Sequence, residues 1–158
     1  MQLLLPSEYQ ETLEALFLSV RGSVLQAYPA ARVEHVGSSA IPGAVSKGDL
    51  DICVLVAPEL HGEAVAALQS SGYTIKADTL RTPELCMLES PRQDFDVALQ
   101  VVAEGSKFEF FMHFRDSLRG NPGLVQEYNQ LKLQYYDRPP NEYREAKAKF
   151  ISSVLGLA

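Results

Sequence analysis

Two aspartates separated by one residue are the feature of this sequence best suited to chemistry. Asp49 and Asp51 open a long apolar stretch ending at Val56, which is typical of a buried strand. Because side chains alternate between the faces of a strand, both carboxylates point to the same side. Mg²⁺ is commonly held by one or two carboxylates together with substrate phosphates, and it would relieve the repulsion between them. The spacing predicts a magnesium site, with a plain surface pair of aspartates as the alternative.

A glycine–serine turn precedes these carboxylates. Gly37 and Ser38 directly follow a short predicted strand, 32–36. Backbone N–H groups and hydroxyls in such turns hold phosphate oxygens, and glycine lets the backbone approach a ligand closely. Ser39 could contribute in the same way. Glycine and serine fill turns of every kind, but the order strand, Gly-Ser turn, loop, Asp-x-Asp and apolar strand is far more specific.

A third carboxylate is expected from a neighbouring strand. In two-metal sites the ions lie about 3.5–4 Å apart, and such a pair generally needs three carboxylates. The segment 95–103 has strong strand propensity, and alternation puts Asp94, Asp96, Ala98 and Gln100 on one face. We favour Asp96, which we place inside the apolar strand, over Asp94 near the turn. Asp49, Asp51 and Asp96 are thus the predicted catalytic residues and metal ligands, with Asp96 as a plain surface aspartate the competing interpretation.

Two other groups near this stretch have alternative interpretations. Lys47 precedes the two carboxylates by two and four residues, and is either a charge on the phosphate side or a solvated loop lysine. A serine nucleophile paired with His35 would suggest acyl transfer. Nothing in the sequence marks an acid to orient that histidine, and the G-x-S-x-G elbow is absent. Acyl transfer is therefore disfavoured.

Composition limits the function further. The 158 residues fit one domain, 1–158, and a hydrophobic content of 46% with 22% charged residues is typical of a soluble globular protein. The formal net charge of −6 provides no global positive field, which disfavours nucleic acid or an anionic membrane as partner. No run reaches membrane-spanning length, and no basic leader precedes the first leucines. Cys53 and Cys86 are expected to be buried, inert thiols, so a reduced, cytoplasmic protein is the expectation.

Periodicity predicts a mixed α+β fold with a C-terminal helical segment. Ser7 to Gln10 has the form of a capping box, so a helix is expected from there to Tyr28. Strands are predicted at 32–36, 49–56, 73–77, 85–89 and 95–103, and further helices at 58–68, from 107 to a break at Asn121-Pro122, from there to 136, and 142–155 with Asn141 as N-cap. Helices alternating with strands, followed by strands joined by short turns, indicate a mixed sheet with helices packed on it.

The motifs together resemble a known family. Gly37-Ser38, then ten residues, then Asp49-Leu50-Asp51-Ile52 resembles the signature of the DNA polymerase β-like nucleotidyltransferase superfamily. The run E-H-V-G-S-S-A-I-P-G-A is similar to the GrpB (UPF0157-like) family within it. Later blocks follow in the family's order: L-Q-V-V-A-E-G-S, F-R-D-S-L-R, E-Y-N-Q-L-K and Y-R-E-A-K. The resemblance covers the chain roughly from Glu34 to Ile151.

The resemblance implies a nucleotidyltransferase-like mixed sheet, a Mg²⁺ cofactor, and an NTP, expected to be ATP, as donor to an unknown acceptor. It also implies that Gly37, Ser38, Ser39 and Lys47 bind the nucleotide. Positions in the later blocks would line the nucleotide or acceptor side of the cleft: Arg115, Lys132, Tyr143 and Lys147. The alternative for Arg115 and Lys147 is a salt bridge between helices, with Asp116, Glu127 or Glu145 as partner.

Two departures from the family pattern matter. Many members have an apolar residue where this chain has Asp49, so K-G-D-L-D here restores the full superfamily motif. Many also carry His-x-His where this chain has Ala98-x-Gln100, so no role of those histidines transfers. Because fold and family do not determine function, two hypotheses follow. The first is a Mg²⁺-dependent nucleotidyltransferase, and the second is a catalytically inactive nucleotide-binding or protein-interaction module on the same fold.

Overall fold

The computed structural model describes residues 2–157. The helices are α1 (Pro6–Ala27), α2 (His61–Ser70), α3 (Phe110–Arg119), α4 (Pro122–Tyr135) and α5 (Pro140–Val154). The strands are β1 (Arg32–Val36), β2 (Leu50–Val56), β3 (Thr74–Ile75), β4 (Leu85–Glu89) and β5 (Val97–Ala103). Three short 3₁₀ turns join them: η1 (Ser38–Ala40), η2 (Pro58–Leu60) and η3 (Lys107–Glu109).

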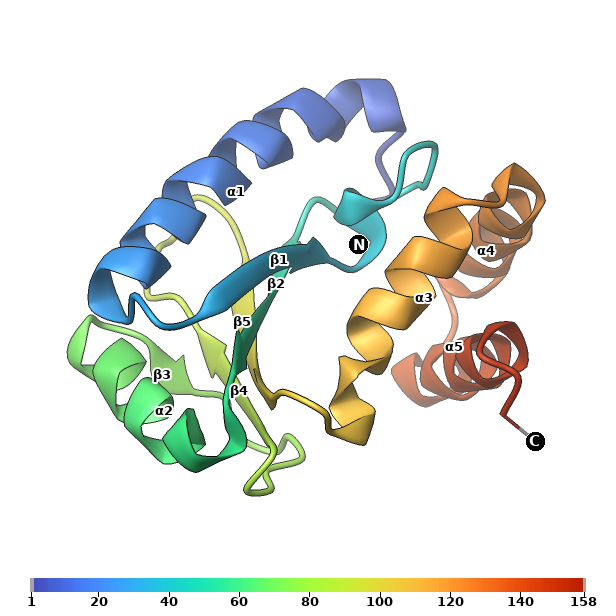
Figure 1. Cartoon of the computed structure of the whole chain (residues 1–158). Coiled ribbons are helices and arrows are strands. Elements are labelled where there is room, and N and C mark those ends of the chain that lie inside the picture. Colours follow the sequence, from blue (N-terminus) through green and yellow to red (C-terminus); the bar gives the residue numbers. More distant parts are fainter. Residues whose placement is uncertain (1, 158) are drawn as a thin grey trace.

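The strands form one mixed sheet in the order β1-β2-β5-β4-β3 (Figure 1). The two central strands, β2 and β5, run parallel, and every other neighbouring pair is antiparallel. A parallel pair needs a long crossover connection, and the segment carrying α2, β3 and β4 supplies it. The α+β class with a mixed sheet and a C-terminal helical segment, predicted from periodicity, is confirmed.

Helices cover both faces of the sheet. Leu50, Ile52 and Val54 of β2 are fully buried in the core that α1 and α2 form on one face. The alternate residues Cys53 and Leu55 are buried on the opposite face, in the core that also holds residues of η3 and α3. Figure 1 shows α1 and α2 on one side and α3 on the other. The two buried faces explain why β2 is a continuous apolar run after Asp51.

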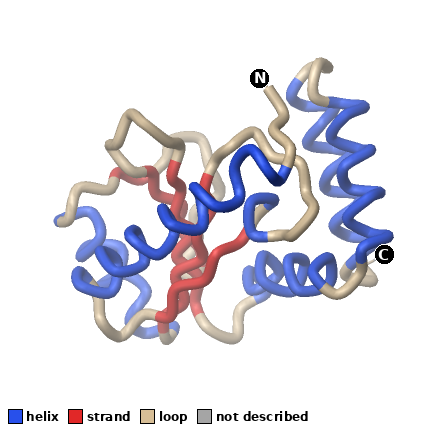
Figure 2. Tube along the Cα trace, turned by 90° about the horizontal axis from the view of Figure 1, so that it is seen from above, coloured by secondary structure: helices blue, strands red, loops and turns tan. Residues whose placement is uncertain are grey.

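The C-terminal helices build a separate core beside the sheet. Figure 2 shows α3 between the strands and the remaining C-terminal helices. Ile41 and Ala44, from the loop that leads into β2, are fully buried against Phe114, Tyr128 and the α5 side chains. This packing holds α4 and α5 over the loop between the Gly-Ser turn and the two aspartates. The helices thereby form a wall opposite the carboxylates.

The ends of several helices differ from the sequence-based expectation: α2 is His61–Ser70 rather than 58–68 and α3 begins at Phe110 rather than 107, because the residues ahead of each form the 3₁₀ turns η2 and η3.

Two further differences concern the first residues of α1 and α5. α1 begins at Pro6 rather than after Ser7, because proline suits the first helical position and the Glu8 carboxylate accepts the Leu5 N–H at 2.8 Å. α5 begins at Pro140 for the same reason, so Asn141 is not its cap. These two predictions were wrong by one or two residues.

The strand boundaries also bear on the site. β3 is only Thr74–Ile75, shorter than the predicted 73–77. β5 begins at Val97, so Asp96 precedes the strand and is exposed, contrary to our placement of it inside the strand. The Leu50 N–H donates to the Asp96 carbonyl at 2.8 Å, which ties the two segments together just before their ladder begins. Cys53 and Cys86 are buried, free thiols as predicted. Within 2–157, no helix is long and apolar enough to cross a membrane.

Candidate active site

The two aspartates sit at the entrance to β2 and repel each other. Asp51 pairs in register with Val36 of β1 and Ala98 of β5, and Asp49 directly precedes the strand. Burial and, second, the charge of Asp49 raise the pKa of Asp51 to about 6, against the opposing effects of Lys147 and Lys47. The structure therefore brings together two partly buried carboxylates whose charges a cation would stabilise.

Gly37 lies directly against Asp51. Its φ of +75° belongs to the region that favours glycine, and a Cβ added there would lie 2.6 Å from Asp51 Oδ2. The glycine is thus required both by its backbone conformation and by the carboxylate. The bend then passes into η1, which starts with Ser38. The predicted proximity of the Gly-Ser turn to the carboxylate pair is present in the structure.

A cavity of about 480 Å³ opens between this turn, the aspartates and the C-terminal helices. Ser38, Asp49 and Asp51 line its sheet side. The helical side carries mainly basic and tyrosine side chains: Lys132, Tyr136, Arg138, Tyr143, Arg144 and Lys147. Anionic groups on one wall and cationic groups on the other match a ligand that carries phosphates together with a divalent cation.

Lys132 of α4 is the most unusual group in this cavity. Its side chain is 3% exposed, and Nζ donates to Ser38 Oγ and, at 2.7 Å, to the Val45 carbonyl. Nζ also lies 4.5 Å from the centroid of the Tyr128 ring. Burial and, second, the charge of Lys147 lower the pKa of Lys132 to about 7, against the opposing charges of Asp49 and Asp51. Its charge therefore depends on what occupies the cavity.

Lys147 of α5 has the opposite character. Its pKa is raised, first by Tyr128 and then by Tyr143 and the two aspartates. Lys147 therefore remains a cation at neutral pH, while Lys132 is close to its titration point. The electrostatic influence of Lys147 on Asp51 supports its predicted place near the nucleotide rather than a salt bridge between helices, and no such bridge from Lys147 is found among residues 2–157.

Asp96 lies on the other flank of the pair. It lines a second cavity, of about 230 Å³, which shares Lys47, Asp49 and Asp51 with the first. Lys47 Nζ is 3.7 Å from Asp49 Oδ2 at this junction. Within the described chain, no group of three or more His, Cys, Asp or Glu side chains is arranged to hold a metal ion. The structure thus brings Asp96 to the site but not into a three-carboxylate cluster.

The donors around Asp51 nevertheless fit a hard cation. Besides the two carboxylates, Gln100 is 7% exposed, and its Oε1 has no hydrogen-bond partner among the described residues. A hydrogen bond from the Gln100 side chain also favours the ionised form of Asp51. Mg²⁺ accepts oxygen ligands of this kind, usually one or two carboxylates completed by phosphates and water. Sequence reasoning placed Gln100 on this face but gave it no role.

Arg115 and Ser39 are not brought to this cavity. Arg115 donates to the His35 carbonyl at 2.9 Å and forms ion pairs with Glu34 at 3.2 Å and Asp116 at 2.9 Å. It lines a different cavity, between α1, β1 and α3. Ser39 is 7% exposed and shares a hydrogen bond with His35. Of the two interpretations weighed for Arg115, the structure favours the ion-pair role.

His35 has a serine and an acid as neighbours, but they do not form an open site. Its Nε2 is 2.9 Å from Ser39 Oγ, and its Nδ1 is 3.6 Å from Glu14 Oε2. The imidazole stacks on Phe17 with ring centroids 5.0 Å apart. Burial, together with the charges of Arg119 and Arg115, lowers the pKa of His35 to about 4. Because Ser39 is buried, a substrate has no access to it. The contacts of His35 with Ser39, Glu14 and Phe17 instead link α1, β1 and η1.

Lys132 could have been assigned to the site from its position alone. The buried residues of α4 are Val125, Tyr128 and Lys132, which follow one helical face. Burying a lysine on an otherwise apolar helix face costs folding free energy, so a lysine at such a position is usually paired or functional. Arg138 and Arg144, which lie in polar segments, give no comparable signal.

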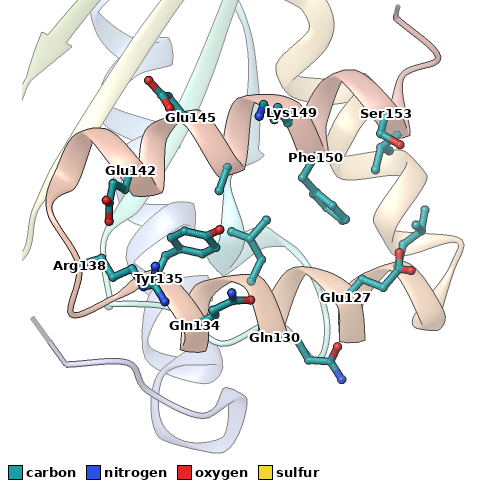
Figure 3. A pocket seen from close by; sticks show the side chains of 14 residues that line it. Glu127, Gln130, Gln134, Tyr135, Arg138, Glu142, Glu145, Lys149, Phe150 and Ser153 are labelled. Carbon is teal, nitrogen blue, oxygen red and sulfur yellow. The ribbon is translucent and has the colours of Figure 1, made fainter.

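A larger cavity, of about 900 Å³, lies between α4 and α5, away from the carboxylate pair. Figure 3 shows the rings of Tyr135 and Phe150 between the two helices. Of the residues around the two aspartates, Arg138 alone also lines this larger space. The larger volume does not make this cavity the candidate site, because the residues with shifted pKa values surround the smaller cavity.

Comparisons with known proteins identify the relatives of this chain. The family model described as GrpB protein matches residues 6–156. A UPF0157 protein of Vibrio cholerae is 51% identical over 158 residues, covering all of this chain and 84% of its own length. A UPF0157 protein of Deinococcus radiodurans is 33% identical over 141 residues, covering 87% of this chain and 73% of its own.

Solved structures show which fold is shared. The conserved protein GrpB from Enterococcus faecalis matches with a TM-score of 0.77 at 21% identity, covering 97% of this chain and 94% of that one. The Cid1 poly(U) polymerase, in a structure with MgGTP bound, matches with a TM-score of 0.51 at 16% identity, covering 70% of this chain and 36% of that one. At such identities the likeness concerns the fold alone, which is nucleotidyltransferase-like.

Proposed function

The chain belongs to the GrpB family, and we propose that it is a Mg²⁺-dependent nucleotidyltransferase. It moves a nucleoside monophosphate from an NTP, expected to be ATP, to an acceptor. The observation that carries this proposal is the cavity in which Ser38 and Lys132 face the Asp49–Asp51 pair. Structural neighbours with MgGTP or MgATP bound support the choice of ligand.

In this proposal the cavity's two walls bind different parts of the donor. The Gly37-Ser38 bend and Lys132 hold the terminal phosphates, and Lys147 adds a permanent positive charge. Phosphate oxygens replace the Ser38 hydroxyl as the partner of Lys132. Tyr136 and Tyr143 line the remaining wall, where a nucleobase can pack on an aromatic ring.

Asp49 and Asp51 would hold Mg²⁺ together with the phosphates, with Gln100 close by. When bound, the ion neutralises charge that develops on the transferring phosphoryl group. The protein's own contribution is to keep two carboxylates partly buried and close together, so that both favour a cation in the ionised state. The role of Asp96 as a further ligand remains a prediction.

The transfer step needs an acceptor hydroxyl in line with the leaving group. The hydroxyl oxygen forms a bond to the α-phosphorus, and the bond from that phosphorus to the pyrophosphate oxygen breaks. The bonding electron pair leaves with pyrophosphate. The hydroxyl proton passes to the Asp96 carboxylate, which is exposed and can release it to solvent. Lys132 and Lys147 stabilise the charge on the departing pyrophosphate.

A second candidate is a nucleotide-binding or protein-interaction module that does not catalyse a reaction. It is favoured by the lack, among residues 2–157, of a three-ligand metal group. Such a module would bind nucleotide through Ser38 and Lys132 without needing the carboxylate pair. The two candidates therefore differ in whether Asp51 and Mg²⁺ are required.

Pyrophosphate release separates the two candidates. The full chain is incubated with each of the four NTPs and a protein-free extract of small molecules as the source of acceptor hydroxyls, with and without Mg²⁺, and compared with Asp51→Asn. We expect Mg²⁺-dependent release that the substitution abolishes. Asp94→Asn is the matched control, because Asp94 is exposed, pairs with Arg92 at 2.7 Å and lines neither cavity. Nucleotide binding that needs no metal and survives Asp51→Asn would instead establish the module.

A further inference from the structure

The register of β2, β5 and β4 determines which side chains lie at the base of the second cavity beside the aspartates. Asp51 of β2 pairs with Ala98 of β5, and Ala98 pairs with Glu89 of β4. Side chains that pair directly across a sheet share a face. Asp51, Ala98 and Glu89 therefore form one row, with the Cα atoms of the two acidic residues about 10 Å apart, or two strand spacings. The small Ala98 methyl group between them leaves the space that becomes the cavity.

This cavity lies where an acceptor must approach. It shares Asp49 and Asp51 with the donor cavity but has none of that cavity's α4 and α5 residues in its lining. An attacking hydroxyl has to reach the α-phosphorus from the side opposite the leaving pyrophosphate. If the terminal phosphates lie toward Lys132 and Lys147, the flank over Ala98 is the opposite side. This inference rests on the function proposed above.

The size of the cavity restricts the acceptor. Its volume is about 230 Å³, below the range of about 300–1,000 Å³ for pockets that enclose drug-sized ligands. A nucleotide or a folded polymer end does not fit within it. A molecule of a few heavy atoms up to the size of a single sugar does. The part of the acceptor that enters this cavity is therefore a small molecule or a group of that size.

The charges of the cavity favour a cationic acceptor. The Glu89 carboxylate has no ion pair or hydrogen bond among the described residues, whereas Arg92 is already bound by Asp94 at 2.7 and 3.0 Å. Lys47 forms an ion pair with Asp49. Among the described lining residues, Lys76 is therefore the cation that has no ion-pair partner. Without a metal, the four carboxylates that line the cavity outweigh Lys47 and Lys76, and with Mg²⁺ on the aspartate pair the charges balance. A phosphate or carboxylate on the acceptor therefore finds no unpaired cation except Lys76, whereas an ammonium group can pair with the free Glu89 carboxylate.

We propose that the cavity over Ala98 is the acceptor site and takes a small hydroxylated amine. The ammonium group binds the Glu89 carboxylate, and a hydroxyl on the same molecule points back across Ala98 toward Asp49 and Asp51. Glu89 is a binding residue for the acceptor, and Ala98 determines how large the acceptor can be. Transfer then joins the nucleoside monophosphate to that hydroxyl by the step described above.

The test compares two probes of equal size, 2-amino-1,3-propanediol and glycerol, which differ in one ammonium group against one hydroxyl. Their binding to the full chain is followed by NMR titration without nucleotide. We expect the amine to bind about fivefold more tightly, as for a solvent-accessible ion pair. Glu89→Gln should abolish this preference. Glu84→Gln should keep it, because Glu84 is exposed and lies outside the cavity. Ala98→Leu should remove binding of both probes.

Two results would overturn the proposal. One is equal binding of the two probes by the unmodified chain. The other is a preference that survives Glu89→Gln but disappears in Asp49→Asn, which would put the ammonium on the paired aspartates. MgATP titrated into the same variants reports on the proposed function separately. Glu89→Gln should bind MgATP like the unmodified chain, because Glu89 does not line the donor cavity, so loss of the acceptor site and failure of nucleotide binding are distinguishable.

Discussion

Gly37 and Asp51 are in such close contact that no side chain fits between them: a Cβ on Gly37 would lie 2.6 Å from Asp51 Oδ2. The bend that we propose to bind phosphate and the carboxylate that we propose to bind the metal are thus one packed unit rather than two neighbouring motifs. The bend cannot move away from the carboxylate without disturbing β1, because Val36 pairs with Asp51 in the sheet.

Gly37→Ala should therefore destabilise the fold and impair the site together. Its φ of +75° with ψ of −175° is a conformation used almost only by glycine, which costs about 1–3 kcal/mol for other residues. The contact with Asp51 adds to that loss. Urea denaturation measures the change. Gly22→Ala is the control, since a Cβ there meets nothing within 4 Å and the residue lies inside α1. It should be neutral or stabilising by up to about 1 kcal/mol. Equal stability of Gly37→Ala and the unmodified chain would contradict the prediction.

Nucleotide binding should be accompanied by proton uptake at Lys132. The pKa of this buried lysine is about 7, so at pH 8 it is mostly neutral in the free protein. A triphosphate next to Nζ favours the charged form, so binding at pH 8 should take up close to one proton. Calorimetric titrations of MgATP in two buffers of different ionisation enthalpy measure this uptake. Lys132→Met should bind more weakly and without it. Binding that is tight and independent of the buffer would exclude a contact between Lys132 and phosphate.

Arg115 and Lys147 should behave differently when each is replaced by methionine. Arg115→Met removes the 2.9 Å hydrogen bond to the buried His35 carbonyl and two ion pairs, so a loss of about 1–3 kcal/mol in stability is expected. Its affinity for MgATP should remain unchanged. Lys147→Met should weaken MgATP binding about tenfold or more, the loss expected for a charge-assisted contact, with little change in stability. The reverse pattern in melting and titration experiments would contradict the assigned roles.

His35 should make stability depend on acidity. Its pKa is about 4 in the folded protein against 6.5 in the unfolded chain, so the unfolded state binds the extra proton between these values. Stability from this residue is present above about pH 6.5 and is lost as the pH falls toward 4. The difference in unfolding free energy between the unmodified chain and His35→Gln should shrink by roughly 3 kcal/mol from pH 7 to pH 4. Parallel pH profiles of the two proteins would show that His35 does not titrate in this way.

Short-range patterns were sufficient to predict most of the fold. The apolar run after Asp51 and the glycine–serine turn predicted β2 and the bend beside it, because alternation and turn chemistry are local properties. The start of α5 was misplaced, because Pro140 at the first helical position outweighed Asn141 as a cap. Asp96 was placed inside a strand that begins one residue later.

The pairing of distant segments could not be predicted in the same way. Lys132 meets Ser38 only because α4 packs over the loop before β2, a contact across 94 residues of sequence. Glu89 joins the row of Asp51 only through the register of β4 with β5 and of β5 with β2. Arg115 resembled a site residue in its motif, but the direction of α3 points it toward β1 and Glu34. Each of these depends on tertiary packing.

The most direct test of a cation-dependent site is the melting temperature of Asp51→Asn with and without MgATP. Removing one of two mutually repelling carboxylates should raise the stability of the free protein by about 1 kcal/mol near pH 7. The same change should abolish the rise in melting temperature that MgATP gives the unmodified chain. A free variant that is no more stable, together with an undiminished shift by MgATP, would contradict the assignment of Asp51 as the residue that binds the metal.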